Sequence, residues 1–223
     1  MFIYQENSLL QLEKTISIYE LIQNGGIGGM LIIGLLFVLL IVVIFIYFER
    51  LFAIKAASKI DNAFMPEIRT HIIGGKIATA KSLCQSYNNP VARLLEKGIS
   101  RIGRPLEDIS SVLENAGRIE IYKLEKNVSI LATIAGVAPM IGFLGTVIGM
   151  ILSIFEISTA GGNIDMQLLS NGLYTAMTTT VAGLIVGIIA YISYNHLVVK
   201  TNKVVYQMET TSLDFFDLLN EPT

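Results

Sequence analysis

Two long uncharged stretches of the chain carry threonines among regularly spaced small residues, a pattern with two possible chemical uses. On a helical wheel of about 100° per residue, Thr146 shares one arc with small residues between Ala135 and Ser153. Thr180 shares a comparable arc with small residues between Gly172 and Gly187. Faces of this kind let helix backbones pack closely, while their hydroxyls can line a narrow polar pore or bond to carbonyls of their own helix. In a ring of subunits the first two uses are compatible.

The candidate site residues fall into two groups on these arcs. The packing group holds Pro139 and five glycines whose lack of a side chain permits close approach: Gly142, Gly145, Gly149, Gly183 and Gly187. The pore or proton-pathway group is Thr146, Thr180, Thr179 and Glu156. Glu156 is the one acid within the apolar stretch of the second span, and it either reaches water at the membrane interface or collects protons at a pore entrance.

Other chemistries find little support in the residues present. The chain has two histidines and one cysteine on separate segments, with no metal-ligand spacing, nucleophile elbow or phosphate loop. We therefore predict no catalytic, cofactor-binding or metal-binding residue, and Cys84 is interpreted as a small buried hydrophobic residue. The net charge of −2 gives no indication of a nucleic-acid partner.

The elements that position these residues are membrane-spanning helices. Hydrophobic residues make up 52% of the 223 residues and charged residues only 15%, with a mean hydropathy of +0.61. Apolar runs without charge predict transmembrane helices at 25–48, 127–156 and 172–199, since about 20 residues cross the hydrocarbon core. The sequence GGNID between the second and third spans supplies turn residues for a hairpin.

The distribution of lysine and arginine predicts how the chain crosses the membrane. Thirteen of the sixteen lie between Arg50 and Lys126, two follow the third span, and the link between spans two and three has none. The positive-inside rule then places the N-terminus in the periplasm and the C-terminus in the cytoplasm. The remaining segments are predicted as a periplasmic amphipathic helix (1–24), a cytoplasmic helical segment (49–126), a periplasmic hairpin (157–171) and a cytoplasmic C-terminal helix (200–223). The fold class is an all-α membrane protein, with three spans and long cytoplasmic helical extensions.

Two motifs in the spans resemble those of the MotA/TolQ/ExbB proton-channel family. The stretch APMIGFLGTVIGM (residues 138–150) resembles the family's Pro-x-x-Gly-x-x-Gly-Thr-Val-x-Gly segment, and GLYTAMTTTVAGLIVGI (172–188) resembles its Ala-x-x-Thr-Thr-x-x-Gly-Leu segment. The order of elements along nearly the whole chain agrees as well. By position, Thr146 and Thr180 match the family's pore-facing threonines, and Pro139 and Gly142 match the segment that shapes the second span.

The resemblance implies a bacterial inner-membrane complex. It implies an oligomeric ring, a pentamer of this subunit, around a dimer of an ExbD/TolR-like single-span partner, with protons as the coupling ion and no other cofactor. A TonB-like protein and membrane lipid are the further expected contacts. One position departs from the family: many ExbB- and TolQ-type members carry a glutamate where this chain has Thr175. The proton carrier is then expected on the partner.

Several alternatives stay open at this stage. A non-conducting oligomeric scaffold explains the glycines but not the threonine positions or the order of the motifs. A Tol-type or motility motor would use the same subunit design as an ExbB-type one, and sodium is an alternative coupling ion. An enzyme lacks catalytic residues, and a substrate transporter lacks the repeated halves around a midplane site.

Overall fold

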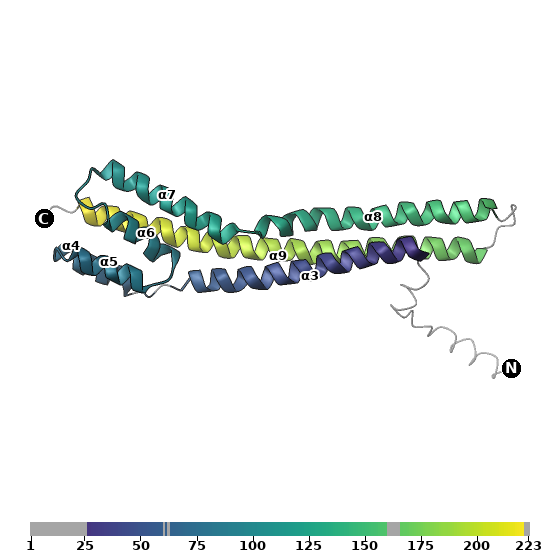
Figure 1. The fold of residues 1–223 in the computed structure, drawn as a ribbon, viewed down its shortest axis with the longest axis horizontal. Helices are drawn as coiled ribbons and strands as arrows, with labels where there is room; N and C mark the ends of the chain where they lie inside the picture. The colour runs from purple at the N-terminus through teal and green to yellow at the C-terminus, as the bar shows by residue number, and fades with distance from the viewer. Residues whose placement is uncertain (1–25, 60, 62, 160–165, 221–223) are drawn as a thin grey trace, which may run out of the picture. The chain divides into compact units, whose positions relative to one another are not determined.

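The computed structural model describes residues 26–59, 61, 63–159 and 166–220 (Figure 1). The predicted periplasmic helix at 1–24 lies outside the described residues, as does the central part of the hairpin predicted at 157–171. The regular elements that the structure describes are all helices, and no strand occurs among these residues. The all-α prediction is confirmed.

Three of the helices are long and apolar enough to cross a membrane. They are α3 (Gly26–Ala57), α8 (Val128–Thr159) and α9 (Met166–Asn220), and their candidate spans cover Gly28–Ala57, Val128–Thr159 and Gly172–Asn220. The three predicted transmembrane helices are thus present. Where the sequence analysis divided the third span from a C-terminal helix at 199/200, the structure has one continuous helix, because no glycine or proline interrupts the chain between Gly187 and Pro222.

Four shorter helices form most of the segment between the first and second spans: α4 (Phe64–Ile73), α5 (Ile77–Ser86), α6 (Pro90–Ile99) and α7 (Leu106–Glu125). Capping and turn-forming residues mark several of the helix ends. Asn89 caps α6 by accepting a hydrogen bond from the Ala92 backbone N–H at 2.7 Å, with Pro90 at the first helical position. Gly75 and Gly103 adopt positive φ in the turns that follow α4 and α6.

The chain divides into two compact units. The first comprises Met1–Val42 and Thr133–Ala190, and holds the parts of α3, α8 and α9 that run side by side there (Figure 1). Large apolar side chains on it are exposed while small ones are buried: Phe37, Met140 and Met177 are more than 60% exposed, whereas Ala138 is fully buried. This arrangement suits a helix bundle in lipid, where large apolar side chains face acyl chains.

The second unit comprises Val43–Ala132 and Tyr191–Thr223, and it has a core typical of a water-soluble helical bundle. Its fully buried side chains include Phe64, Ile68, Leu95, Ile99 and Phe215, drawn from α4, α6 and α9. A Cβ placed on Gly98 would meet Leu113 and Phe215 at 2.9 Å, so α6 packs closely against α7 and α9.

Candidate functional site

The α8–α9 hairpin brings the predicted packing glycines into backbone contact. A Cβ placed on Gly183 would lie 2.6 Å from the Ala138 carbonyl oxygen and 2.9 Å from the Gly142 Cα. A Cβ on Gly142 would lie 2.8 Å from the Thr179 carbonyl oxygen. Real Cβ atoms are not found this close to backbone atoms, so both positions require glycine for the observed packing.

The other packing residues continue the same interface along both helices. Gly149 faces Ala176, whose Cβ would lie 3.3 Å from an added Cβ, and Gly187 faces Pro139, whose Cγ would lie 2.7 Å away. Gly145 lies directly against the Thr179 side chain. All six residues assigned to packing, including Pro139, therefore meet at one interface within a single chain.

Thr180 joins the two helices through its hydroxyl. The Thr180 Oγ1 donates a hydrogen bond to the Gly142 carbonyl oxygen at 3.3 Å, from α9 to α8. Thr179, by contrast, is fully buried, and its hydroxyl donates to the Ala176 carbonyl oxygen of its own helix at 2.8 Å. Within one chain Thr179 is a packing residue, and a part for it in a proton pathway stays a prediction.

Thr146 lies on the edge of the hairpin, and its hydroxyl donates to the Phe143 carbonyl oxygen at 2.6 Å. The contacts of α3 show which edge this is. A Cβ on Gly28 of α3 would meet Ile148 and Leu152 of α8 at 3.6 and 3.8 Å. Thr146 stands two residues before Ile148, roughly 200° around the helix, and so faces away from α3.

The same geometry separates Thr180 from Thr175 on α9. Thr175 is buried, and its Cγ2 would lie 2.7 Å from a Cβ placed on Gly29 of α3. Thr180 follows five residues later, roughly 140° around the helix. Thr146 and Thr180 therefore both lie on the side of the hairpin away from α3, while the position matching the family's glutamate faces α3. The Glu156 side chain lies outside the described residues, and its assignment stays a prediction.

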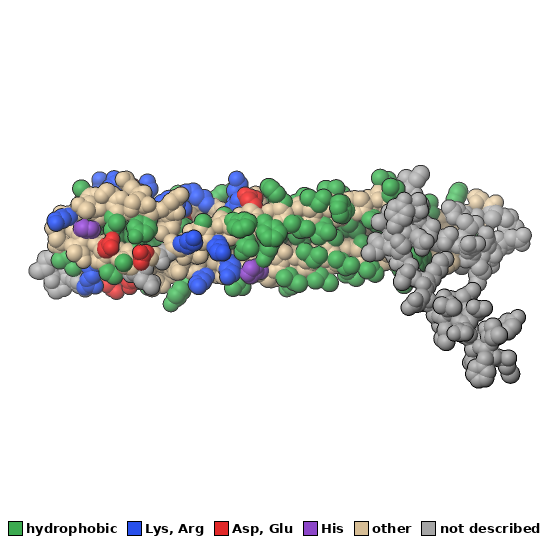
Figure 2. Space-filling view, turned by 90° about the horizontal axis from the view of Figure 1, so that it is seen from below, with side chains coloured by type: hydrophobic (Ala, Val, Ile, Leu, Met, Phe, Trp, Pro, Cys, Tyr) green, Lys and Arg blue, Asp and Glu red, His purple; other side chains and the backbone are tan. Residues whose placement is uncertain are grey.

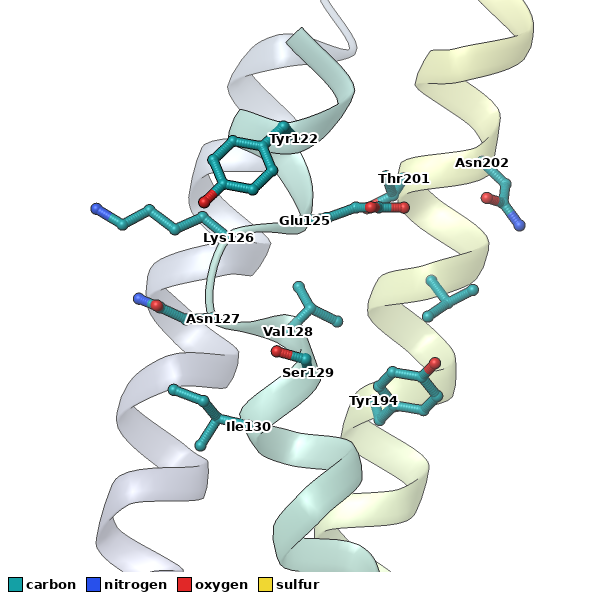
Figure 3. A pocket seen from close by; sticks show the side chains of 11 residues that line it. Tyr122, Glu125, Lys126, Asn127, Val128, Ser129, Ile130, Tyr194, Thr201 and Asn202 are labelled. Atoms are coloured by element: carbon teal, nitrogen blue, oxygen red, sulfur yellow. The ribbon is translucent and has the colours of Figure 1, made fainter. Parts of the chain in front are cut away.

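A pocket of about 560 Å³ that the sequence did not predict, called here the polar pocket because most of its lining residues are polar, lies where α7 passes into α8 against α9 (Figure 3). Asn127 makes the turn with a φ of 64°, and Tyr122, Glu125 and Lys126 line the pocket beside it. From α9, Thr201 is 2% exposed, and its hydroxyl has no hydrogen-bond partner among the described residues. Thr201 stands between Lys200 and Asn202, so the sequence gives no signal that distinguishes its buried hydroxyl from that of a surface threonine.

A buried carboxylate organises the neighbouring ion pairs. Glu120 of α7 accepts hydrogen bonds from Arg93 at 2.5 and 3.0 Å and from Lys123 at 2.6 Å. Burial alone would raise the pKa of Glu120, but the bonds and charges of Arg93 and Lys123 outweigh it and lower the pKa below its ordinary value. These ion pairs join Arg93 of α6 to Glu120 of α7. We interpret them as a structural contact between the two helices.

The remaining reactive side chain is Cys84, which is buried and free. Burial, followed by the nearby charge of Glu96, raises the pKa of its thiol to about 12. A thiol with this pKa is unreactive at neutral pH, in agreement with its interpretation as a small hydrophobic residue. Among the described residues, no three or more His, Cys, Asp or Glu side chains are grouped to hold a metal ion.

Comparison with known protein families gives a match over more than half of the chain. The family model described as "MotA/TolQ/ExbB proton channel family" matches residues 86–210, which include the polar pocket, α8 and most of α9. The match thus covers Pro139, Thr146 and Thr180 and every other residue assigned above to the hairpin interface.

Individual relatives point in the same direction. The chain is 26% identical over 186 residues to the putative biopolymer transport protein ExbB homolog of Methanothermobacter thermautotrophicus, covering 81% of this chain and 63% of that protein. It is 41% identical over 78 residues to the putative biopolymer transport protein ExbB-like 2 of Helicobacter pylori, covering 35% of this chain and 51% of the relative. Over 215 residues it is 25% identical to the Tol-Pal system protein TolQ of Pseudomonas aeruginosa, covering 92% and 93%. The chain thus spans between half and two thirds of the length of the first two relatives and nearly all of the third.

Proposed function

The chain belongs to the MotA/TolQ/ExbB proton channel family, and from this premise we propose that it is the channel-forming subunit of an inner-membrane motor driven by the proton-motive force. The observation that carries the proposal is the placement of Thr146 and Thr180 on the side of the α8–α9 hairpin away from α3. In a ring of subunits with α3 outermost, this side faces the centre. Two hydroxyls per subunit then line the pore.

The proposed partner is a dimer of an ExbD/TolR-like single-span protein that occupies a pore formed by a pentamer of this chain. A hydroxyl neither ionises nor stores a proton near pH 7, so proton transfer needs a titratable group. No Asp, Glu, Lys or Arg lies between Lys126 and Glu156 or between Asp165 and Lys200, and the one histidine there, His196, stands at the end of the third span. The proton carrier is therefore assigned to a membrane carboxyl of the partner.

Energetics make such a carrier workable. A carboxylate at mid-membrane costs about 2.5–3.5 kcal/mol on insertion scales. A proton that falls through 100 mV releases roughly 2.3 kcal/mol, which is comparable to that cost. Threonine hydroxyls facing the carboxylate stabilise its charged form, so that the group can alternate between protonated and charged states.

The proposed topology places the N-terminus in the periplasm and the second unit, with the C-terminus, in the cytoplasm. The support is the concentration of lysine and arginine between Arg50 and Lys126 and their absence from the link between α8 and α9. In this orientation the polar pocket around Thr201 lies at the cytoplasmic end of α8.

We assign the chain to the ExbB type, in which the complex energises a TonB-type transport process at the outer membrane. The support is that relatives in several organisms carry the name biopolymer transport protein ExbB. A TolQ relative aligned along almost its full length makes a Tol-type motor the second candidate. A motility motor and a non-conducting scaffold remain the other readings.

The test is the mass and composition of the complex purified from native membranes, in mild detergent, by a tag on this chain. The proposal expects a pentamer with two copies of a small single-span protein that carries a transmembrane acid. A TonB-like or Tol-Pal protein recovered with it decides between the two types. A homo-oligomer without such a partner, under conditions that preserve other membrane complexes, contradicts the motor and favours the scaffold.

A further inference from the structure

A basic pocket of about 310 Å³ opens between α3 and α9 within the second unit. Three lysines line it, Lys55 from α3 and Lys200 and Lys203 from α9, together with Ser58 and His196. The lysines are exposed, and none forms an ion pair with another described residue. No acidic side chain is among its described lining residues. The pocket therefore presents uncompensated positive charge.

The histidine in this pocket is held in place by a neighbour. The Tyr47 hydroxyl and the His196 Nδ1 lie 2.9 Å apart in a hydrogen bond, and the two ring centroids are 5.9 Å apart. The imidazole is thereby fixed as a wall of the pocket, on the same helix as Lys200 and Lys203. A flexible surface histidine would not shape the pocket in this way.

Exposed aromatic rings adjoin the charged groups. Phe48 and Phe52 are 50% and 65% exposed, and their rings stack with centroids 6.4 Å apart. Phe52 itself lines the pocket. Figure 2 shows lysine and arginine side chains gathered beside a histidine at the edge of the hydrophobic surface. A small soluble anion would not contact the exposed rings of Phe48 and Phe52. A phospholipid would, because it joins an anionic headgroup to apolar acyl chains.

The position along α3 agrees with a lipid headgroup. The uncharged run of α3 ends at Phe48, and Lys55 follows roughly 10 Å further along the helix at about 1.5 Å per residue. The headgroup layer extends roughly 5–8 Å beyond the hydrocarbon core on each side, and a lysine side chain bridges the difference by reaching back toward the interface. Basic pockets between transmembrane helices are suited to anionic headgroups.

We propose that this pocket binds an anionic phospholipid. Lys55, Lys200 and Lys203 hold its phosphate, His196 closes one side, and Phe48 and Phe52 contact its acyl chains. Through this contact the lipid joins α3 to α9 at the membrane surface. The proposal does not depend on the motor function.

The experiment measures lipid retention by the full complex purified from native membranes. After detergent washing, the complex is mixed with phosphatidylglycerol or phosphatidylcholine in detergent, and bound lipid is counted by native mass spectrometry. The pocket variant is K55Q/K200Q/K203Q. The matched control, K76Q/K81Q/K97Q, removes the same charge from three lysines of the second unit outside the pocket.

Wild type and the control variant are expected to retain phosphatidylglycerol in preference to phosphatidylcholine. The pocket variant should retain at least about tenfold less phosphatidylglycerol, since each lysine contributes to the electrostatic attraction. The variant K55R/K200R/K203R should restore retention, which separates loss of charge from loss of fold.

Four outcomes overturn the proposal. Equal retention in the pocket and control variants removes the site, and equal retention of the two lipids removes the headgroup preference. Displacement of the lipid by millimolar inorganic phosphate indicates a site for a free anion. A changed number of copies in the pocket variant with unchanged lipid indicates that a second copy of the chain covers the pocket.

Discussion

Gly142 and Gly183 face each other across the interface of α8 and α9, where a Cβ on Gly183 would lie 2.9 Å from the Gly142 Cα. In lipid, helix association depends on packing and interhelical hydrogen bonds because the apolar solvent supplies no hydrophobic driving force. The glycine faces are therefore used inside one chain to join the hairpin. The Thr146 and Thr180 edge is left for contacts beyond it.

Replacing Gly183 by alanine should separate α8 from α9. The added Cβ would meet the Ala138 carbonyl oxygen at 2.6 Å, and backbone cannot move aside as a side chain does. We expect a loss of about 1–3 kcal/mol, as for other overpacked interiors, measured by thermal unfolding of the purified complex. Gly136→Ala, on α8 with no atom within 4 Å of its Cβ, is the control and should unfold at the wild-type temperature or slightly above it, because alanine favours the helix. Equal melting of both variants would contradict the interface.

The role of the Thr180 hydroxyl can be tested separately from the volume of the Thr180 side chain. Thr180→Val should assemble normally and lose motor output, because it keeps the volume but removes the hydroxyl, whose one hydrogen bonds to the Gly142 carbonyl here and can turn toward a group in the pore. The interhelical bond itself is worth only about 0.6 kcal/mol. Thr180→Ser should retain output. Output is read as partner-dependent proton flux in reconstituted vesicles.

Two further valine variants complete this test. Thr178 stands two residues before Thr180, roughly 200° around α9 and so off the proposed pore side, and Thr178→Val should keep wild-type flux. Thr146 lies on the pore side proposed for the hairpin, so Thr146→Val should lose flux as Thr180→Val does. Wild-type flux in both Thr146→Val and Thr180→Val would exclude the two hydroxyls from the pathway.

Much of the fold can be predicted from the sequence, because two simple patterns mark membrane helices: a long charge-free run and a regular spacing of small residues. Charge-free runs predicted the three spans, and glycine spacing predicted a packing face that includes Gly142 and Gly183. The helical wheel cannot say whether a small residue packs within its own chain or against a neighbour. Thr179 shows this, since it shares the arc of Thr180 yet is fully buried within the hairpin.

Sequence patterns did not predict the features that depend on contacts between residues far apart in the chain. The basic residues Arg93, Lys97, Arg101 and Arg104 repeat at helical spacing, a pattern that predicts a solvated helix face. The pairing of Arg93 with Glu120, 27 residues away, depends on how α6 meets α7. The pocket around Thr201 likewise needs the Asn127 turn and α9 together.

Removing the buried hydroxyl of Thr201 should not destabilise the protein, although most substitutions of buried residues do. A hydroxyl removed from water without a hydrogen bond costs about 1–3 kcal/mol, and that of Thr201 has no partner among the described residues. Thr201→Val should therefore unfold at the same temperature as the wild type or higher. Thr211→Val is the control, because the Thr211 hydroxyl bonds to the Gln207 carbonyl oxygen at 2.8 Å and its loss should not stabilise. A lower melting temperature for Thr201→Val would show that the hydroxyl is bonded.

The Cys84 thiol should resist alkylation in the folded protein. With a pKa of about 12 instead of 9.0, its thiolate fraction at pH 8 is about a thousandfold lower than that of an unshifted thiol. N-ethylmaleimide should label the native complex very slowly and the denatured chain rapidly, as followed by mass spectrometry. Rapid labelling of the native complex would contradict the burial. Because Cys84 is the only cysteine, a cysteine introduced at an exposed position serves as the positive control.

The Glu120 ion pairs predict a pH-dependent contribution to the stability of the helical segment. The pKa of Glu120 is lowered on folding from its ordinary value of 4.5. The unfolded chain then binds the proton more readily. The stabilisation is fully present above about pH 4.5 and is lost as the pH falls through the lower, folded pKa. Glu120→Gln should cost about 1–3 kcal/mol at pH 7, because a neutral amide with one acceptor oxygen replaces the buried carboxylate that pairs with Arg93 and Lys123. The difference in stability between Glu120→Gln and the wild type should shrink as the pH falls below 4.5, measured by hydrogen exchange of α6 and α7 amides in detergent.

The control is Glu114→Gln, which breaks an exposed ion pair with Arg118 and should cost under about 0.5 kcal/mol at every pH. A difference for Glu120→Gln that stays constant down to pH 3 would mean that the carboxylate contributes through its shape and not through its charge.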